Sequence, residues 1–175
     1  MIDYQLWIDS LTKPKETFAA QKGKGTWTNA VINYVIAGLL AGIISAVLTL
    51  GIGFLAIVTT PIAYVVGSLI GVGILFVLAK LLGAKGDYLN LFYLLSLYAV
   101  PMAVLMMIPI VGILAGLYSL YLLYWVLTQG MEMTSGRAIA LIVILIIVAL
   151  VLAFIIAAAV IAALLGAGAL GTMHP

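Results

Sequence analysis

Long stretches without a charged side chain constrain this chain more than any other feature. Residues 25–79, 88–131 and 138–175 contain no Asp, Glu, Lys or Arg. An ionised side chain at mid-bilayer costs about 2.5–3.5 kcal/mol, whereas a Leu or Ile there gains only about 0.3–0.6 kcal/mol. The windows are therefore typical of membrane-spanning segments. The chain is also 67% hydrophobic, which is more than a water-exposed surface allows.

The lengths of these windows predict an all-α, polytopic integral membrane protein with five transmembrane helices in a bundle. A spanning helix needs about 20 residues, so the first two windows hold two helices each and the last holds one. Pro61 and Pro109 interrupt the two longer windows, and proline suits the first turn of a helix. The expected helices are Thr28–Leu50, Pro61–Leu82, Tyr88–Met107, Pro109–Gln129 and Arg137–Leu165.

A short lead-in, residues 1–26, precedes the predicted transmembrane domain of residues 27–165. Its apolar side chains recur at helical spacing and predict an amphipathic helix that buries one stripe in the membrane interface. A second turn is expected to begin at Pro14, with Phe18 facing inward. The alternative is that the lead-in docks a partner. The stripe consists of Tyr4, Trp7, Ile8 and Leu11.

Every Lys and Arg falls at one end of the predicted bundle, and the positive-inside rule makes that end cytoplasmic. The expected location is the cell membrane, with the N-terminus cytoplasmic and a short extracytoplasmic tail at residues 166–175. A hairpin around Pro109 that re-enters the membrane without crossing it would give the same charge pattern, although its limbs are long enough to cross. The basic residues are Lys13, Lys15, Lys22, Lys24, Lys80, Lys85 and Arg137.

Five charged residues between the predicted helices are candidates for a face that docks a protein partner. We expect Glu132 and Arg137 to lie near Lys85 and Asp87 at the cytoplasmic surface, with Lys80 beside them. Exposed charge pairs stabilise a fold little, so an interaction role is the more informative hypothesis.

Two tyrosines, Tyr118 and Tyr121, lie deep in the fourth predicted helix. A hydroxyl in the membrane interior needs an acceptor. The structural interpretation is a hydrogen bond to another helix, through a group such as Ser96 or Ser68. The functional interpretation is a polar path for a solute.

Three pairs of glycines have the GxxxG spacing, on three different predicted helices. Absent side chains let helix backbones approach closely in a membrane. Packing within the chain is the default interpretation, and a homo-oligomer is the alternative. The pairs are Gly38 and Gly42, Gly67 and Gly71, and Gly112 and Gly116.

The sequence offers no catalytic constellation. It has no cysteine, its single histidine, His174, stands alone near the end of the last window, and tyrosine is the only other ionisable type inside the windows. Thiolate chemistry is thereby excluded, and Ser or Thr without a base partner gives no nucleophile. We expect no enzyme, no cofactor and no metal site. The formal charge of +2 is too small to indicate a nucleic-acid partner.

Several short segments and single residues, in a fixed order along the chain, carry a resemblance to a known family. They are Pro14-Lys-Glu-Thr-Phe18, Gly83-Ala-Lys-Gly86, Tyr98-Ala-Val-Pro101, Pro109-Ile-Val-Gly112, Trp125, Gly130 and Ser135-Gly-Arg-Ala138. In these segments the chain resembles the Yip domain family, polytopic membrane proteins named for interacting with Ypt/Rab GTPases. The resemblance implies five spanning helices and a cytosolic N-terminus, and the short lead-in looks like that of bacterial or archaeal members. In eukaryotes the family belongs to early secretory membranes and vesicle traffic.

These observations together predict a non-enzymatic scaffold, adaptor or membrane-organising protein in contact with the lipid bilayer. The alternative is a transporter or channel for a small solute or lipid, which would use the deep tyrosines.

Overall fold

Residues 3–171 fold entirely into helices and their connections, as the sequence predicts. The structure is a computed structural model that describes these residues, with side chains described for residues 3–162. Five of its helices are long and apolar enough to cross a membrane, which confirms the predicted class. The elements are α1 (Tyr4–Thr12), α2 (Pro14–Gln21), α3 (Trp27–Leu48), α4 (Ala56–Leu81), α5 (Tyr88–Leu105), α6 (Pro109–Trp125), the π-helix η1 (Val126–Gly130) and α7 (Ser135–Gly171).

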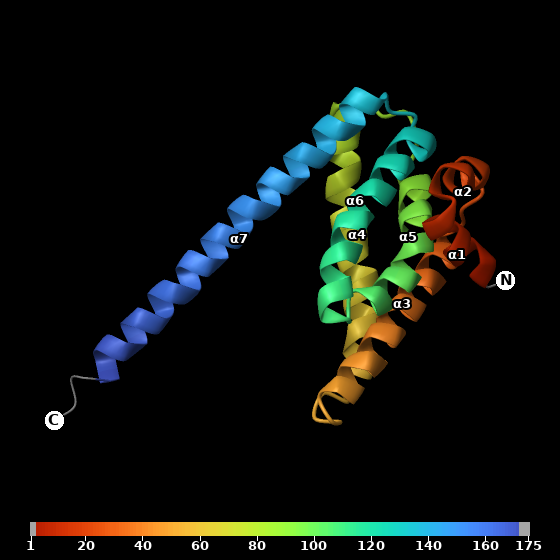
Figure 1. The fold of residues 1–175 in the computed structure, drawn as a ribbon. Helices are drawn as coiled ribbons and strands as arrows, with labels where there is room; N and C mark the ends of the chain where they lie inside the picture. Colours follow the sequence, from red (N-terminus) through yellow and green to blue (C-terminus); the bar gives the residue numbers. More distant parts are fainter. Residues whose placement is uncertain (1–2, 172–175) are drawn as a thin grey trace.

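Two helical hairpins form the body of the molecule (Figure 1). The longer joins α3 to α4, the shorter joins α5 to α6, and on the outside of this body α1 lies against α5 while α2 lies against η1 and α6. The α2–α3, α4–α5 and η1–α7 connections lie together at the upper end in Figure 1. We call this the charged end, because it carries Lys80, Lys85, Asp87, Glu132 and Arg137.

Missing side chains bring α3 and α4 together. A Cβ added at Gly38 would overlap the Cα of Pro61, and one at Gly42 would lie 2.5 Å from the carbonyl oxygen of Ala56. Pro61 was expected in the first turn of this helix, but α4 begins five residues earlier, at Ala56. The contact with α3 explains the difference, because it stabilises an extra turn. Pro61 has no N–H to donate to the carbonyl four residues earlier, and this missing hydrogen bond lies near the start of the helix, where it disturbs α4 little.

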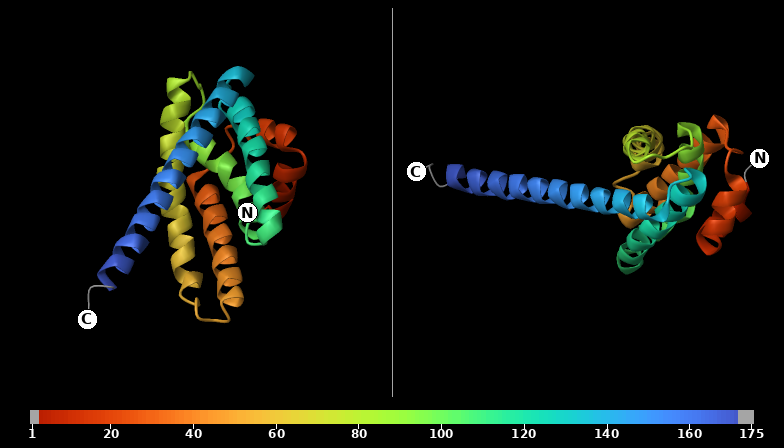
Figure 2. Two further views of the ribbon diagram at one scale, coloured as in Figure 1. Left: turned by 60° about the vertical axis from the view of Figure 1, so that its left-hand side comes forward. Right: turned by 90° about the horizontal axis from the view of Figure 1, so that it is seen from above.

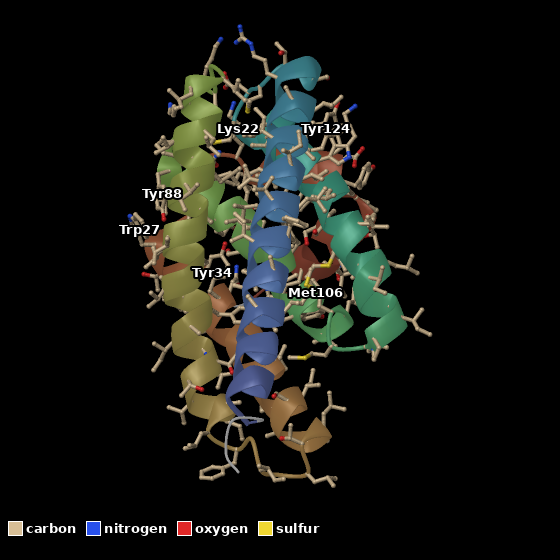
Figure 3. All side chains as sticks on the ribbon, turned by 90° about the vertical axis from the view of Figure 1, so that its left-hand side faces the viewer. Lys22, Trp27, Tyr34, Tyr88, Met106 and Tyr124 are labelled. Atoms are coloured by element: carbon tan, nitrogen blue, oxygen red, sulfur yellow. The ribbon has the colours of Figure 1, made fainter. Side chains whose placement is uncertain are left out.

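Aromatic rings tie α3, α4 and α5 together on the half of the bundle nearest the charged end. Phe92 is fully buried, with ring centroids 4.8 Å from Tyr34 and 5.8 Å from Tyr88. Trp27 lies 5.7 Å from Tyr88 and 5.6 Å from Phe92, and Phe76 packs edge-on against Tyr88. Figure 3 shows Trp27 and Tyr88 next to each other beside α4. The best-packed part of the core therefore lies close to the charged end.

The α5–α6 hairpin is shorter than the α3–α4 hairpin. Its turn ends well short of the α3–α4 turn in Figures 1 and 3, where Met106 marks it. The 18 residues of α5 span about 27 Å, close to the hydrocarbon thickness of about 30 Å. Its partner limb ends not in the expected α-helical turn but in η1, which runs to Gly130. Crossing by this hairpin therefore stays a prediction.

The last helix, α7, leaves the bundle and packs against it only at its start. Ala138 and Leu141 are buried, whereas Leu150, Phe154 and most side chains beyond them are exposed. Figure 2 shows the helix diverging from the other elements. Its 37 residues span about 55 Å, which exceeds the hydrocarbon thickness of about 30 Å. The helix continues past Leu165 to Gly171, so residues 166–171 of the expected tail are helical; His174 lies outside the described residues.

Candidate functional site

Two connections at the charged end are joined into a single surface. The backbone N–H of Lys85 donates to the carbonyl of Met131 at 2.9 Å, and that of Gly86 donates to the same carbonyl at 3.4 Å. Ala84, Met131 and Met133 point into the core, whereas Lys85 and Glu132 beside them are exposed. The buried side chains thus hold the backbone of both connections in place, while the charged side chains next to them point outward.

Asn90, in the first turn of α5, links three parts of the charged end. Its side-chain oxygen accepts from the N–H of Gly23 at 2.8 Å, and its side-chain nitrogen donates to the carbonyl of Gly130 at 2.8 Å. Its own N–H donates to the capping carboxylate of Asp87 at 2.6 Å. Only 5% of the residue is exposed. Asn90 is not among the residues that the sequence predicts for this end; its one signal is an amide side chain just inside an apolar window.

All five predicted docking residues are exposed at the charged end, but they are not paired as expected. Glu132 forms an ion pair with Lys22 of the lead-in, instead of meeting Lys85. The hydrogen bond and positive charge of Lys22 hold the pKa of the Glu132 carboxyl below its ordinary value. The ammonium of Lys80 donates to the carbonyl of Lys85 at 3.3 Å, and Asp87 caps α5.

Arg137, the fifth of these residues, lies beside Gly83 at the end of α4. Gly83 adopts φ +85°, in the left-handed region that favours glycine. A Cβ there would lie 2.5 Å from a guanidinium nitrogen of Arg137. The turn therefore requires this glycine, whereas the exposed arginine side chain could move aside. Figure 3 shows Lys22 and Tyr124 toward this end of the molecule.

Tyr118 has a hydrogen-bond acceptor, but it is neither of the two serines that the sequence suggests. The hydroxyl of Tyr118 donates to the carbonyl of Leu11 in α1, and the two tyrosine rings lie 5.5 Å apart. Ser96, one of the expected acceptors, instead accepts from the Asn33 amide at 3.0 Å. The contact that Tyr118 makes is a helix-packing hydrogen bond, although its partner is the lead-in and not a spanning helix.

The predicted stripe of the lead-in helix α1 divides into a packed half and an exposed half. Trp7 donates its indole N–H to the Asn33 amide oxygen at 3.2 Å, and Leu11 packs against the core, as does Leu6 beside the stripe. Tyr4 and Ile8 of the stripe are 69% and 50% exposed, so these two side chains are free to contact the membrane interface. Burial of the stripe in the interface stays a prediction.

The three glycine pairs have three different environments. Gly38 and Gly42 serve the contact between α3 and α4. Gly112 is crowded by the backbone of Met106 in the α5–α6 turn, while nothing lies within 4 Å of a Cβ built on Gly67 or Gly71. Self-association through this second pair stays a prediction.

Charges gathered at one end of a bundle of long apolar helices define a polytopic α-helical membrane protein. The chain matches the Yip1 domain over residues 8–159 and belongs to the Yip1 domain family, which confirms the resemblance. No curated protein and no solved structure is found to match it.

Proposed function

We propose that this Yip1-family protein is a non-enzymatic membrane scaffold or adaptor whose charged end docks a protein partner on the cytoplasmic side. The observation that carries the proposal is the combination of a fixed backbone with exposed charges of both signs. Lys85 and Glu132 flank the hydrogen bonds that join the two connections. A surface that is already ordered loses little conformational entropy on binding.

The backbone of Glu132 supports the same proposal. It adopts φ +53°, a left-handed conformation that costs a non-glycine residue of order 1–3 kcal/mol. Its neighbours Met131 and Met133 are buried and hold it there. Backbone strain of this kind clusters at binding and switch regions, where it positions a side chain.

The test is site-specific photocrosslinking in native membranes. We introduce benzoylphenylalanine in place of Lys85 and, as a matched control, in place of the exposed Lys13 of the lead-in. We expect a discrete protein adduct from position 85 only, and the charge reversal Arg137→Glu should reduce its yield. Equal adducts from both positions, or a yield that Arg137→Glu leaves unchanged, would contradict a docking face at the charged end.

The orientation in this proposal has its own measurement, because the chain contains no cysteine. Single variants Lys85→Cys, Ile52→Cys and Ile108→Cys place one thiol in each of three connections. We expect a membrane-impermeant maleimide added outside cells to label positions 52 and 108 but not position 85. Labelling at 85 from outside would invert the topology, and protection at 108 would indicate a re-entrant hairpin.

A further inference from the structure

A polar cleft lies between α1, α3 and α5, away from the docking residues. It has a volume of about 240 Å³. Its polar walls come from Asp3, Gln21, Lys24, Asn29, Asn33 and Tyr93. An aqueous cleft of this composition is unusual in a chain with only 7% charged residues, and the docking face uses none of these side chains. The cleft therefore calls for an occupant of its own.

The cleft presents one positive and one negative side chain that do not neutralise each other. Asp3 and Lys24 both line it. Among the side chains of residues 3–162, the ion pair within 4 Å is that of Lys22 with Glu132, so the Asp3 carboxylate and the Lys24 ammonium stand farther apart than contact. A ligand that carries both an anionic and a cationic group can pair with Lys24 and Asp3 together, whereas a simple anion would be repelled by the Asp3 carboxylate.

The position of the cleft along α3 places it at the level of lipid headgroups. On α3 it is lined by Asn29, Ile32 and Asn33, which lie about 3–9 Å along the helix from Trp27 at 1.5 Å per residue. The polar layer on each side of a bilayer is about 5–8 Å thick. The cleft also has apolar walls, and Ile32 is 38% exposed on the outer surface, where acyl chains run.

We propose that this cleft binds the headgroup of a zwitterionic phospholipid, with the phosphate toward Lys24 and the ammonium toward Asp3. Asn29 offers a further amide to the same headgroup, and Leu6, Ile32 and Leu97 contact the start of an acyl chain. Phosphatidylethanolamine fits best, because its ammonium has three N–H donors for the carboxylate and amide oxygens. This inference does not rest on the proposed docking face, and either can fail alone.

The test measures binding of short-chain lipids to the purified full chain in detergent, by native mass spectrometry. We expect dioctanoyl phosphatidylethanolamine to bind more tightly than dioctanoyl phosphatidylglycerol, which has the phosphate but no ammonium. Asp3→Asn should abolish this preference by lowering the affinity for phosphatidylethanolamine, and Lys24→Gln should lower the affinity for both lipids. Each loss should be roughly tenfold, as expected for one charge-assisted hydrogen bond. Asparagine also caps helices well, so α1 should keep its N-cap.

Matched controls are Asp9→Asn and Lys13→Gln, which remove the same charges from the lead-in outside the cleft. Both should leave affinity and preference unchanged. A wild-type chain without preference between the two lipids, or a preference that survives Asp3→Asn, would overturn the proposal. Glycerophosphoethanolamine binding as tightly as the lipid would also overturn it, since the occupant would then be a soluble molecule.

Discussion

Replacing Asn90 should destabilise the charged end more than any substitution of an exposed residue there. The amide accepts from Gly23 and donates to Gly130, both at 2.8 Å, so it connects the start of α3, α5 and the end of η1. Asn90→Leu keeps the number of side-chain heavy atoms and removes both bonds. The buried Gly130 carbonyl is then left without this partner, and the N–H of the exposed Gly23 loses its acceptor.

The magnitude follows from the two lost partners. A buried polar group left unsatisfied costs about 1–3 kcal/mol, and interhelical hydrogen bonds in membrane proteins fall toward or below the lower limit. Most of the cost therefore comes from the buried Gly130 carbonyl, and we expect a loss of about 1–3 kcal/mol in the free energy of unfolding for Asn90→Leu. Asn90→Asp keeps the acceptor for Gly23, but it replaces the donor to the Gly130 carbonyl with a carboxylate oxygen in a site that is 5% exposed, so it should cost at least as much as Asn90→Leu.

The assay is SDS-induced unfolding in mixed micelles, followed by circular dichroism. The matched control is Gln129→Leu, an amide in the same region whose side chain makes no hydrogen bond among the described residues. This control should change the free energy of unfolding by about 0.5 kcal/mol or less. If Asn90→Leu and Gln129→Leu unfold at the same SDS fraction, the linking role of Asn90 is refuted.

Two further predictions concern helix packing and pH. Gly38→Ala should lower the free energy of unfolding by about 1–3 kcal/mol, because its Cβ overlaps the backbone of α4. The control Gly67→Ala, with open space around it, should be neutral or stabilising by up to about 1 kcal/mol. Equal effects of the two substitutions in the SDS assay would contradict this packing. The pKa of Glu132 is lowered in the folded protein, so its pair with Lys22 stabilises the fold at pH values above the ordinary carboxyl pKa of 4.5. This stabilisation is lost as the pH falls through the lower pKa of the folded state. Wild type and Glu132→Gln should therefore differ in thermal midpoint near neutral pH and converge as the pH falls below the folded pKa of Glu132, and a difference independent of pH would argue against the pair.

Charge placement made the helical architecture predictable, because the cost of ionised groups in hydrocarbon does not depend on tertiary detail. The number of spanning helices and the position of the charged end follow from it. Helix ends were less predictable. Pro61 marked the expected start of α4, but the helix starts earlier, where the backbone of Ala56 lies against Gly42. That contact joins residues far apart in sequence, and nothing in the local pattern reveals it.

The sequence could not predict which polar groups form hydrogen bonds or ion pairs with one another. Tyr118 was predicted to need an acceptor, yet the acceptor is the carbonyl of Leu11, and a carbonyl is present at every position of the chain. The pairing of Glu132 with Lys22 joins residues 110 positions apart. Charge counting places both at the same end but cannot choose between Lys22 and Lys85, because several basic residues gather there.

Three successive residues between α2 and α3 connect the parts of the molecule to which we assign functions. Lys22 pairs with Glu132 of the docking surface, the Gly23 N–H donates to Asn90, and Lys24 lines the cleft. A headgroup that holds Lys24 therefore restricts a segment only two residues from the ion pair. Binding at two sites linked through one element is reciprocal, so each ligand changes the affinity for the other by the same factor. We expect the crosslinking yield from position 85 to change with the phosphatidylethanolamine content of the membrane in wild type but not in a Lys24→Gln variant, and an equal response in both would show that the two sites act independently.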